Sequence, residues 1–235
     1  MASKRFKRAA SKVDQNTPYT LERAVALLKE LPPAKFNETV ELSVSLNIDP
    51  KKTDQIVRGT VTLPHGTGKT RKVVVFCKGE NEVLAKEAGA DEVGAADLIE
   101  KISGGWMDFD VAVATPDLMR DVSRLGKILG PRGMMPNPKA GTVTEDVAKA
   151  VKDVKQGKVE FKMDKLSNIH FVIGKVSFKP EQLVENGRVA VEAIVRARPS
   201  SVKGHMINRL SLAGTMSPGI PLKTDGLETD TAQDD

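Results

Sequence analysis

Residues 36–49 read FNETVELSVSLNID, and their apolar and polar side chains alternate one by one. A period of two residues is typical of a β-strand with one buried face and one wet face. The stretch therefore predicts a strand that lies against a core on one side and faces water on the other. Its apolar positions are Val40, Leu42, Val44, Leu46 and Ile48, and its polar positions are Thr39, Glu41, Ser43, Ser45 and Asn47.

The same strand-rich texture occurs at both ends of the chain. A helix is predicted over residues 20–31, with Thr20 as its N-cap and Pro32 as its stop, and another from Pro180 to about residue 198. Further strands are predicted over residues 55–63 (QIVRGTVTL), 158–164 (KVEFKMD), 168–178 (NIHFVIGKVSF) and 206–214 (MINRLSLAG).

Between these ends, short apolar strands alternate with helices. Such alternation is typical of a parallel sheet in a layered domain. One helix that starts near Pro116 is expected to place Leu118, Val122, Leu125 and Leu129 on its buried face. The predicted strands are 71–77 (RKVVVFC) and 109–114 (FDVAVA), and the other predicted helices are 81–90, 97–102 and 145–157.

Strand-rich segments on both sides of an α/β segment indicate one discontinuous domain with a second domain inserted into it. The predicted fold class is α/β. It combines a split α+β domain, a β-sheet with helices on one side, and an inserted Rossmann-like three-layer α/β domain. The split domain is expected over residues 1–66 and 158–235, and the inserted domain over residues 67–157. Both crossings contain glycine and basic residues, as interdomain linkers often do.

Composition narrows the class of protein. No stretch of the 235 residues is apolar over the length of a membrane span, so no membrane partner is expected. The N-terminal segment has basic residues without an apolar core, which does not match a secretory signal. Cys77 is the single cysteine and falls in a predicted strand, which indicates a reducing, cytoplasmic location.

Charge is unevenly distributed along this basic chain, whose net charge is +5. The last eleven residues carry only acidic charges, and a solvated tail is the preferred interpretation for them. A basic arm at the other end favours a polyanionic partner, most often nucleic acid. Aromatic residues make up only 4%, so a sheet that stacks many bases on aromatic rings is not expected. The arm contains Lys4, Arg5, Lys7, Arg8 and Lys12.

Residues 66–70 (GTGKT) look like part of a phosphate-binding loop, which would indicate a nucleotide-using enzyme. That loop runs from a strand through G-x-x-x-x-G-K-[ST] into a helix, and Leu63 stands where its first glycine belongs. The residues after Thr70 predict a strand instead of a helix. We therefore interpret GTGKT as a hinge between domains, with a nucleotide-using enzyme as the alternative hypothesis.

Two stretches rich in glycine and proline are candidates for ligand contact. Residues 125–143 (LGKILGPRGMMPNPKAGTV) predict a long ordered loop, neither helix nor strand, whose Arg132 and Lys139 could meet phosphates. A loop packed against its own domain is the alternative, and a dinucleotide site is disfavoured because no G-x-G-x-x-G opens a helix. Residues 211–222 (SLAGTMSPGIPL) offer the Thr215 and Ser217 hydroxyls and the adaptable Met216 side chain.

Signals for catalysis or metal binding are weak. The three histidines fall in separate segments, with no cysteine or histidine at ligand spacing. No nucleophile elbow or triad motif is visible. We expect no metal, no cofactor and no catalytic residue, so a binding protein is favoured over an enzyme.

Four separate motifs closely resemble the bacterial large-subunit ribosomal protein L1 (uL1) family. The resemblance runs from about Tyr19 to Pro221, nearly the whole chain. The motifs are AKFNETVELSVSLNIDPKKTDQIVRGTVTLPHGTGKT, LGPRGMMPNPKAGTV, DKLSNIHFVIGKVSF and LAGTMSPG.

This resemblance implies a function. Members of the family are not enzymes, and they combine a split RNA-binding domain with an inserted Rossmann-like domain. They bind 23S rRNA directly and form the mobile stalk that escorts tRNA from the exit site, beside other ribosomal components in the cytoplasm. Many also repress translation of their own operon by binding its mRNA leader. These properties are expectations for the present chain.

The resemblance also implies an RNA-binding surface on the wet face of the split domain. The family more often has hydroxyl residues in place of Ala213 and Gly214, and glycine in place of Ser217. Leu166 and Ser167 also replace smaller or more polar residues. The expected contacts are Lys35, Phe36, Thr39, Glu41, Asp164, Lys165, Ser167, His170, Ser211, Thr215, Met216 and Gly219, with Arg132, Lys139, Lys4 and Arg5 as secondary contacts.

Overall fold

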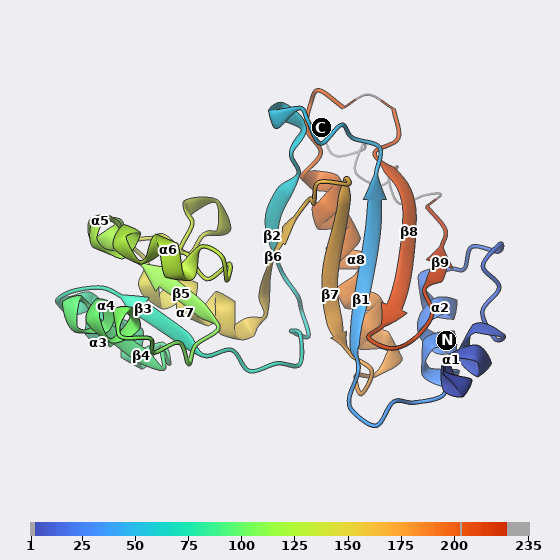
Figure 1. Cartoon of the computed structure of the whole chain (residues 1–235), viewed down its shortest axis with the longest axis horizontal. Coiled ribbons are helices and arrows are strands. Elements are labelled where there is room, and N and C mark those ends of the chain that lie inside the picture. Colours follow the sequence, from blue (N-terminus) through green and yellow to red (C-terminus); the bar gives the residue numbers. More distant parts are fainter. Residues whose placement is uncertain (1–2, 203, 225–235) are drawn as a thin grey trace. The chain divides into compact units, whose positions relative to one another are not determined.

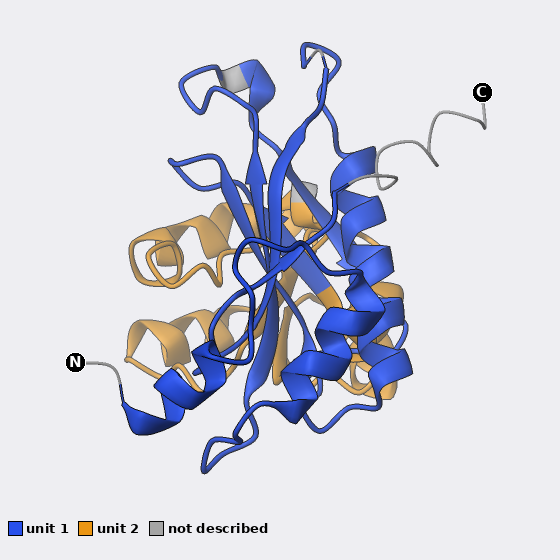
Figure 2. Ribbon diagram, turned by 90° about the vertical axis from the view of Figure 1, so that its right-hand side faces the viewer, with its two compact units in different colours: residues 1–68, 159–235 blue, residues 69–158 orange. Residues whose placement is uncertain are grey.

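The computed structural model describes residues 3–202 and 204–224, except for the side chains of Thr53 and Lys139. The chain is a mixed α/β protein, as the sequence predicts (Figure 1). It divides into two compact units (Figure 2). Unit 1 combines the described residues up to Gly68 with those from Val159 onward, and unit 2 is Lys69–Lys158. The assignment of these segments to independent domains stays a prediction.

Unit 1 is built on a four-stranded antiparallel sheet in the order β7-β1-β8-β9. The central strand β1 (Thr39–Leu46) contains the alternating stretch, and every second residue of it is buried, which confirms the predicted pattern. Its neighbours come from the C-terminal half of the chain. They are β7 (Asn168–Lys175), β8 (Ile207–Gly214) and, beyond β8, the short β9 (Ile220–Leu222).

Two helices pack on one face of this sheet. They are α2 (Leu21–Glu30) and α8 (Pro180–Arg196), and their apolar sides form one core with the buried side of the strands. The predicted cap of α2 is confirmed, because the Thr20 hydroxyl accepts a hydrogen bond from the Arg23 N–H. Asn186 lies fully buried in α8, and its amide group donates to the carbonyls of Ile173 and Gly66. Within the described residues of unit 1, no helix lies on the opposite face of the sheet (Figure 1).

A separate two-stranded ribbon joins β2 (Arg58–Thr62) to β6 (Lys158–Lys162), and a short 3-10 turn, η1 (Thr53–Gln55), precedes β2. After β2 the chain passes through Gly68, which has φ +72° and lies under the Phe178 ring. A Cβ at this position would approach Phe178 to 2.8 Å, so the site requires glycine for both reasons.

Unit 2 contains a parallel three-stranded sheet in the order β4-β3-β5. All four residues of the central strand β3 (Val73–Phe76) are buried, because helices cover both faces. Val74 and Phe76 pack in a cluster with α4 (Ala96–Ser103), whereas Val73 and Val75 pack with α7 (Val147–Gln156). The remaining elements are β4 (Glu92–Gly94), β5 (Val111–Ala114) and α3 (Glu80–Glu87).

Leu118, Val122, Leu125 and Leu129 are all buried, as predicted. The single helix expected for them is broken into four short turns, and the expectation that residues 125–143 hold no helix is wrong. The run keeps helical geometry because these apolar residues recur every three or four positions. The turns are η2 (Pro116–Leu118), α5 (Met119–Val122), η3 (Ser123–Leu125) and α6 (Gly126–Leu129), followed later by η4 (Pro138–Ala140).

The basic N-terminal arm is also more ordered than expected. Lys4–Ala10 form helix α1, whose N-cap Ser3 accepts a hydrogen bond from the Phe6 N–H. Ala9 is 1% exposed and belongs to the core of unit 1, which anchors the helix. The acidic tail expected at residues 225–235 lies outside the described residues.

Candidate nucleic-acid interface

The outward side chains of β1, β7 and β8 form a polar surface, which we call the open face. The register places Ser43 between His170 of β7 and Ser211 of β8, and Glu41 between Val172 and Ala213. The segments that meet here lie on both sides of unit 2 in the sequence. The open face consists of Thr39, Glu41, Ser43, Ser45, Asn168, His170, Val172, Arg209, Ser211 and Ala213.

Glu41 and His170 differ in how their polar groups are used. The side chain of Glu41 makes no hydrogen bond or ion pair with the described residues, so its carboxylate is available as an acceptor. His170 is exposed, and its Nδ1 lies 3.2 Å from the Ser43 hydroxyl. The open face therefore presents a carboxylate without a hydrogen-bond partner and an imidazole whose Nδ1 is close to a hydroxyl.

One end of the open face, which we call the turn end, is the β6–β7 turn at residues 164–167. Asp164 Oδ1 accepts hydrogen bonds from the N–H groups of Leu166 and Asn168, at 2.8 Å and 2.7 Å. The Asn168 N–H is the main reason that the pKa of Asp164 lies below its usual value, and the Leu166 N–H also contributes. Lys165 is exposed, and Leu166 is 78% exposed. The turn thus presents a cation and an apolar side chain to solvent.

Ser167 does not fit the expected list of contacts. Its side chain is buried, with the residue only 6% exposed, and its hydroxyl donates to the Ile48 carbonyl at 2.7 Å. Ser167 also has φ +63°, a strained conformation for a residue other than glycine. Its hydroxyl holds the turn together and is not free to contact a ligand, so we remove it from the candidate surface.

The opposite end, which we call the loop end, joins residues 32–38 to residues 214–219. Both loops present large apolar groups to solvent, since Phe36 is 54% exposed and Met216 is 52% exposed. Lys35 is exposed in the first loop. Gly219 lies in the second loop, and a Cβ added to it would meet nothing within 4 Å. The fold of unit 1 thus leaves open space beside Gly219.

Thr215 connects the loop end to the sheet. Its hydroxyl accepts a hydrogen bond from the Thr39 N–H at 3.0 Å, and its own N–H donates to the Thr39 carbonyl. Lys175 donates to the Thr39 hydroxyl at 2.7 Å. Thr215 is exposed, but its side chain also closes the pairing of β1 with the loop after β8, so a substitution should affect stability as well.

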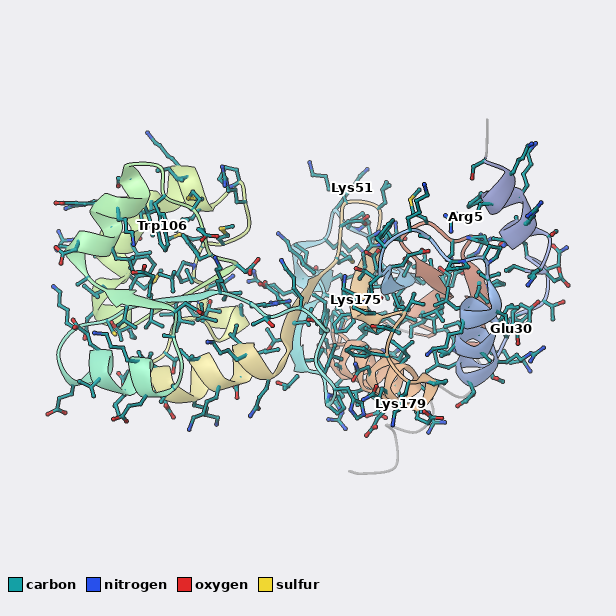
Figure 3. The ribbon with its side chains drawn as sticks, turned by 90° about the horizontal axis from the view of Figure 1, so that it is seen from below. Arg5, Glu30, Lys51, Trp106, Lys175 and Lys179 are labelled. Carbon is teal, nitrogen blue, oxygen red and sulfur yellow. The ribbon has the colours of Figure 1, made fainter. Side chains whose placement is uncertain are left out.

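Glu38 is a buried carboxylate at the loop end that the sequence did not indicate as functional. It is 7% exposed, and it accepts hydrogen bonds from the N–H groups of Ala34 and Met216. Arg5 of α1, which is labelled in Figure 3, approaches Glu38 to 3.5 Å and also donates to the carbonyls of Met216 and Pro32. Arg5 was expected as a secondary RNA contact, and in the folded chain its guanidinium is engaged within unit 1.

Two of the expected departures from the family pattern, Gly214 and Ser217, contact each other in one turn. A Cβ on Gly214 would lie 3.0 Å from Glu38 Oε2 and 3.2 Å from Ser217 Oγ, so a larger residue would require these side chains to shift by a few tenths of an ångström. Ser217 Oγ accepts from the Gly214 N–H at 2.7 Å and closes the turn. In this chain a hydroxyl at position 217 stabilises a loop in which position 214 is glycine.

The structure thus brings most of the expected contacts onto one unit. Ser167 and Arg5 belong to the same unit but serve the fold. Arg132 is exposed in unit 2, Lys4 is exposed on α1, and the side chain of Lys139 lies outside the described part of the structure. Placed on or beside the open face are Lys35, Phe36, Thr39, Glu41, Asp164, Lys165, His170, Ser211, Thr215, Met216 and Gly219.

Three residues of this surface were missed. Arg209 lies opposite Ser45 and is exposed, and Lys175 reaches Thr39 from the neighbouring strand. The two-residue period could have identified Arg209, because it shares a face with Ser211. Glu38 left no such signal, since its partners are fixed by tertiary structure.

The GTGKT segment has no phosphate-binding geometry. Lys69 Nζ lies 2.8 Å from Asp110 Oδ1, and this hydrogen bond is the main cause that lowers the pKa of Asp110. The chain then enters strand β3 at Val73, so no helix N-terminus faces the glycines. Lys69 neutralises a carboxylate of its own unit.

Other kinds of site receive little support. Burial raises the pKa of Cys77 to about 11, with a smaller contribution from Glu82, so this thiol is a poor nucleophile at neutral pH. No group of three His, Cys, Asp or Glu side chains within residues 3–202 and 204–224 could hold a metal ion. In the same described ranges, no helix combines the length and apolar character of a membrane span.

The chain is similar to known proteins over nearly its whole length. Residues 28–218 match the model of the "Ribosomal protein L1p/L10e family". The chain is 56% identical over 225 residues to "Large ribosomal subunit protein uL1" of Leifsonia xyli subsp. xyli, covering 96% of this chain and 98% of the relative. The proteins of the same name from Bifidobacterium longum and Rhodococcus erythropolis are 53% and 55% identical, covering 96% and 94% of this chain and 98% and 92% of the relatives. The chain therefore belongs to the ribosomal protein L1 family.

Proposed function

We propose that the open face and the loop end of unit 1 dock on a prefolded segment of 23S rRNA. Membership of the family makes the chain a structural protein of the large ribosomal subunit, in the cytoplasm with the ribosome, and not an enzyme. The observation that supports the docking proposal is the open face itself, a polar sheet surface that no described helix of unit 1 covers. Ribosomal RNA is the partner that the family implies.

Each part of the surface has chemistry that suits a folded RNA. Lys35 and Lys165 neutralise phosphates, while hydroxyl and backbone groups contact ribose 2′-hydroxyls. The free carboxylate of Glu41 accepts a hydrogen bond from a base amino group or a 2′-hydroxyl. Met216 and Phe36 offer exposed apolar surface for an unstacked base or a sugar. The open space beside Gly219 lets the RNA backbone approach the loop closely.

The proposal extends to the roles of the two domains, the ribosomal stalk and the operon mRNA. Residues 67–157 act as an inserted Rossmann-like domain of three layers, and residues 1–66 with 158–235 act as the RNA-binding domain. Together with the bound rRNA, the protein forms the mobile stalk that releases tRNA from the exit site. The same surface binds the mRNA leader of its own operon and represses translation. Arg132, Lys139 and Lys4 are secondary RNA contacts in this proposal.

A salt series tests the docking step. Filter binding of the full chain to transcribed 23S rRNA is compared with binding to 16S rRNA between about 50 and 200 mM KCl. We expect tighter binding to 23S rRNA at every concentration, with affinity falling steeply as salt rises because phosphate contacts release counterions. Equal affinity for both RNAs would reject the proposal, and an affinity independent of salt would reject phosphate-led binding.

The nucleotide-using alternative has its own test. The ion pair of Lys69 with Asp110 and the strand after Thr70 argue against it. We expect no heat when ATP or GTP is titrated into the protein in a calorimeter. Saturable heat that disappears in Lys69→Ala would revive the alternative.

A further inference from the structure

We infer that Arg5 and Glu38 form a positioning pair that holds the 214–219 loop in its RNA-binding shape. Helix α1 then assists recognition through the position of one guanidinium, and not mainly through its positive charge. This inference rests on the proposed RNA-binding function of unit 1. It assigns a role in RNA recognition to Glu38, which is buried, and to α1, which is short and basic.

The chemistry around Glu38 requires a carboxylate. Oε1 accepts the Ala34 N–H at 3.1 Å, and Oε2 accepts the Met216 N–H at 2.9 Å. Both oxygens therefore face backbone donors, and Arg5 adds a positive charge at 3.5 Å from Oε1. A glutamine would turn its NH₂ group toward one of these donors and leave a buried N–H unpaired.

Arg5 completes the arrangement from the other direction. Its Nη2 donates to the Met216 carbonyl at 2.7 Å, and its Nη1 donates to the Pro32 carbonyl at 3.0 Å. The backbone of Met216 is thus held at its N–H by Glu38 and at its carbonyl by Arg5. A guanidinium suits this task because its donors form a rigid planar fork.

The groups held in this way include exposed parts of the loop end. Met216 is 52% exposed, although both of its backbone polar groups are fixed. The loop with Lys35 and Phe36 is held at both ends, through the Pro32 carbonyl and through Glu38 itself. One ion pair therefore connects α1 to the two loops that carry several of the proposed contacts.

A charge-based explanation of α1 predicts something different. If α1 acted as a basic arm, any cation on it would contribute a phosphate contact, and its loss would reduce the salt dependence of binding. Arg8 is the matched control, because it lies on the same helix, is exposed and makes no side-chain hydrogen bond or ion pair with the described residues. Arg5→Gln and Arg8→Gln remove the same charge.

The first experiment measures the affinity of full-length variants for transcribed 23S rRNA across a KCl series. We expect Arg5→Gln and Glu38→Gln each to weaken binding about tenfold or more, with the salt slope of the wild type, and Arg8→Gln to stay within about twofold. Arg5→Lys keeps the charge without the fork, and we expect it to recover only part of the loss. Equal effects of Arg5→Gln and Arg8→Gln, or a lower salt slope in Arg5→Gln, would overturn the inference.

The second experiment does not depend on RNA. Hydrogen exchange of the Met216 and Ala34 amides should be faster in Arg5→Gln and Glu38→Gln than in the wild type and Arg8→Gln, with far-UV circular dichroism unchanged. Unchanged exchange would overturn the positioning pair even if RNA affinity fell. If wild-type protein bound 23S rRNA no better than 16S rRNA, the proposed function would fail, whereas the exchange data would still decide whether the pair holds the loop.

Discussion

The two ends of the open face are each closed by a carboxylate that accepts two backbone N–H groups. At the turn end, Asp164 binds donors two and four residues ahead of it and stays exposed. At the loop end, Glu38 is buried, and one of its donors, Met216, lies 178 residues away. The same acid–amide chemistry is a local turn in one case and a long-range connection in the other. Burial makes the second arrangement more costly to break, because an unpaired N–H there has no water to replace its partner.

Removal of the buried carboxylate is expected to have the largest effect on stability and tests the difference between the two ends most directly. Glu38→Ala leaves two backbone donors without their acceptor and the Arg5 guanidinium without its charge partner, so we expect unit 1 to lose about 3 kcal/mol of unfolding free energy. Urea unfolding followed by circular dichroism measures this change. Glu30→Ala, an exposed site on α2, is the control and should change stability by less than about 0.5 kcal/mol. Equal losses in the two variants would contradict the assigned role.

A second comparison separates residues that serve the loop from residues that serve a ligand. Thr215→Val removes the hydroxyl that pairs with Thr39, so we expect about 1–2 kcal/mol less stability together with weaker RNA binding. Gly219→Ala adds a methyl group to open space, so stability should change by less than about 0.5 kcal/mol. The free energy of binding to 23S rRNA should still become about 1–3 kcal/mol less favourable, because the methyl group would occupy the space that the RNA backbone is proposed to enter. Unfolding curves and filter binding on the same preparations give both numbers, and unchanged affinity in Gly219→Ala would count against close RNA approach at this loop.

At the turn end, removing the Asp164 carboxylate should reduce stability by a smaller amount, and this loss should depend on pH. The pKa of Asp164 is lowered in the folded protein, mainly by the Asn168 N–H, so its stabilising contribution is present above its unfolded pKa. The contribution is lost as pH falls below about 4 and through the folded pKa. Asp164→Asn should therefore lower the urea midpoint slightly at pH 7 and make less difference at pH 3. A difference in urea midpoint between the wild type and Asp164→Asn that grew as the pH fell would contradict this prediction.

In unit 2, Cys77 directly follows the buried strand β3, and we expect its thiol not to react in the folded protein. Cys77 is 0% exposed, and burial raises the pKa of its thiol to about 11. We expect no reaction with a thiol reagent at pH 7.5 over the time in which urea-unfolded protein reacts completely. Rapid labelling of the native chain would show that β3 opens far more readily than its packing implies.

Sequence reasoning succeeded where one local pattern fixes the structure. The alternation in residues 36–49 predicted both the strand and its open face, and the Thr20 cap marked the start of α2. It failed for α1 because a short, basic segment has no obvious buried side; the small Ala9 provides the anchor. It listed Ser167 and Arg5 as RNA contacts without indicating the hydrogen bonds that they make within unit 1, because their partners, Ile48 and Met216, are distant in the chain.

The sequence by itself determined the longer strands, the main helices, the mixed α/β class and the motifs of the family, since each depends on neighbours within a few residues. It did not indicate the short strands β4 and β9. Tertiary structure alone decided which polar groups remain free on the open face. Glu41 and Glu38 are three residues apart, yet only Glu38 meets backbone donors from a distant loop and becomes buried. A carboxylate in water and a carboxylate between two amides are identical in sequence, and only the folded chain supplies the second environment.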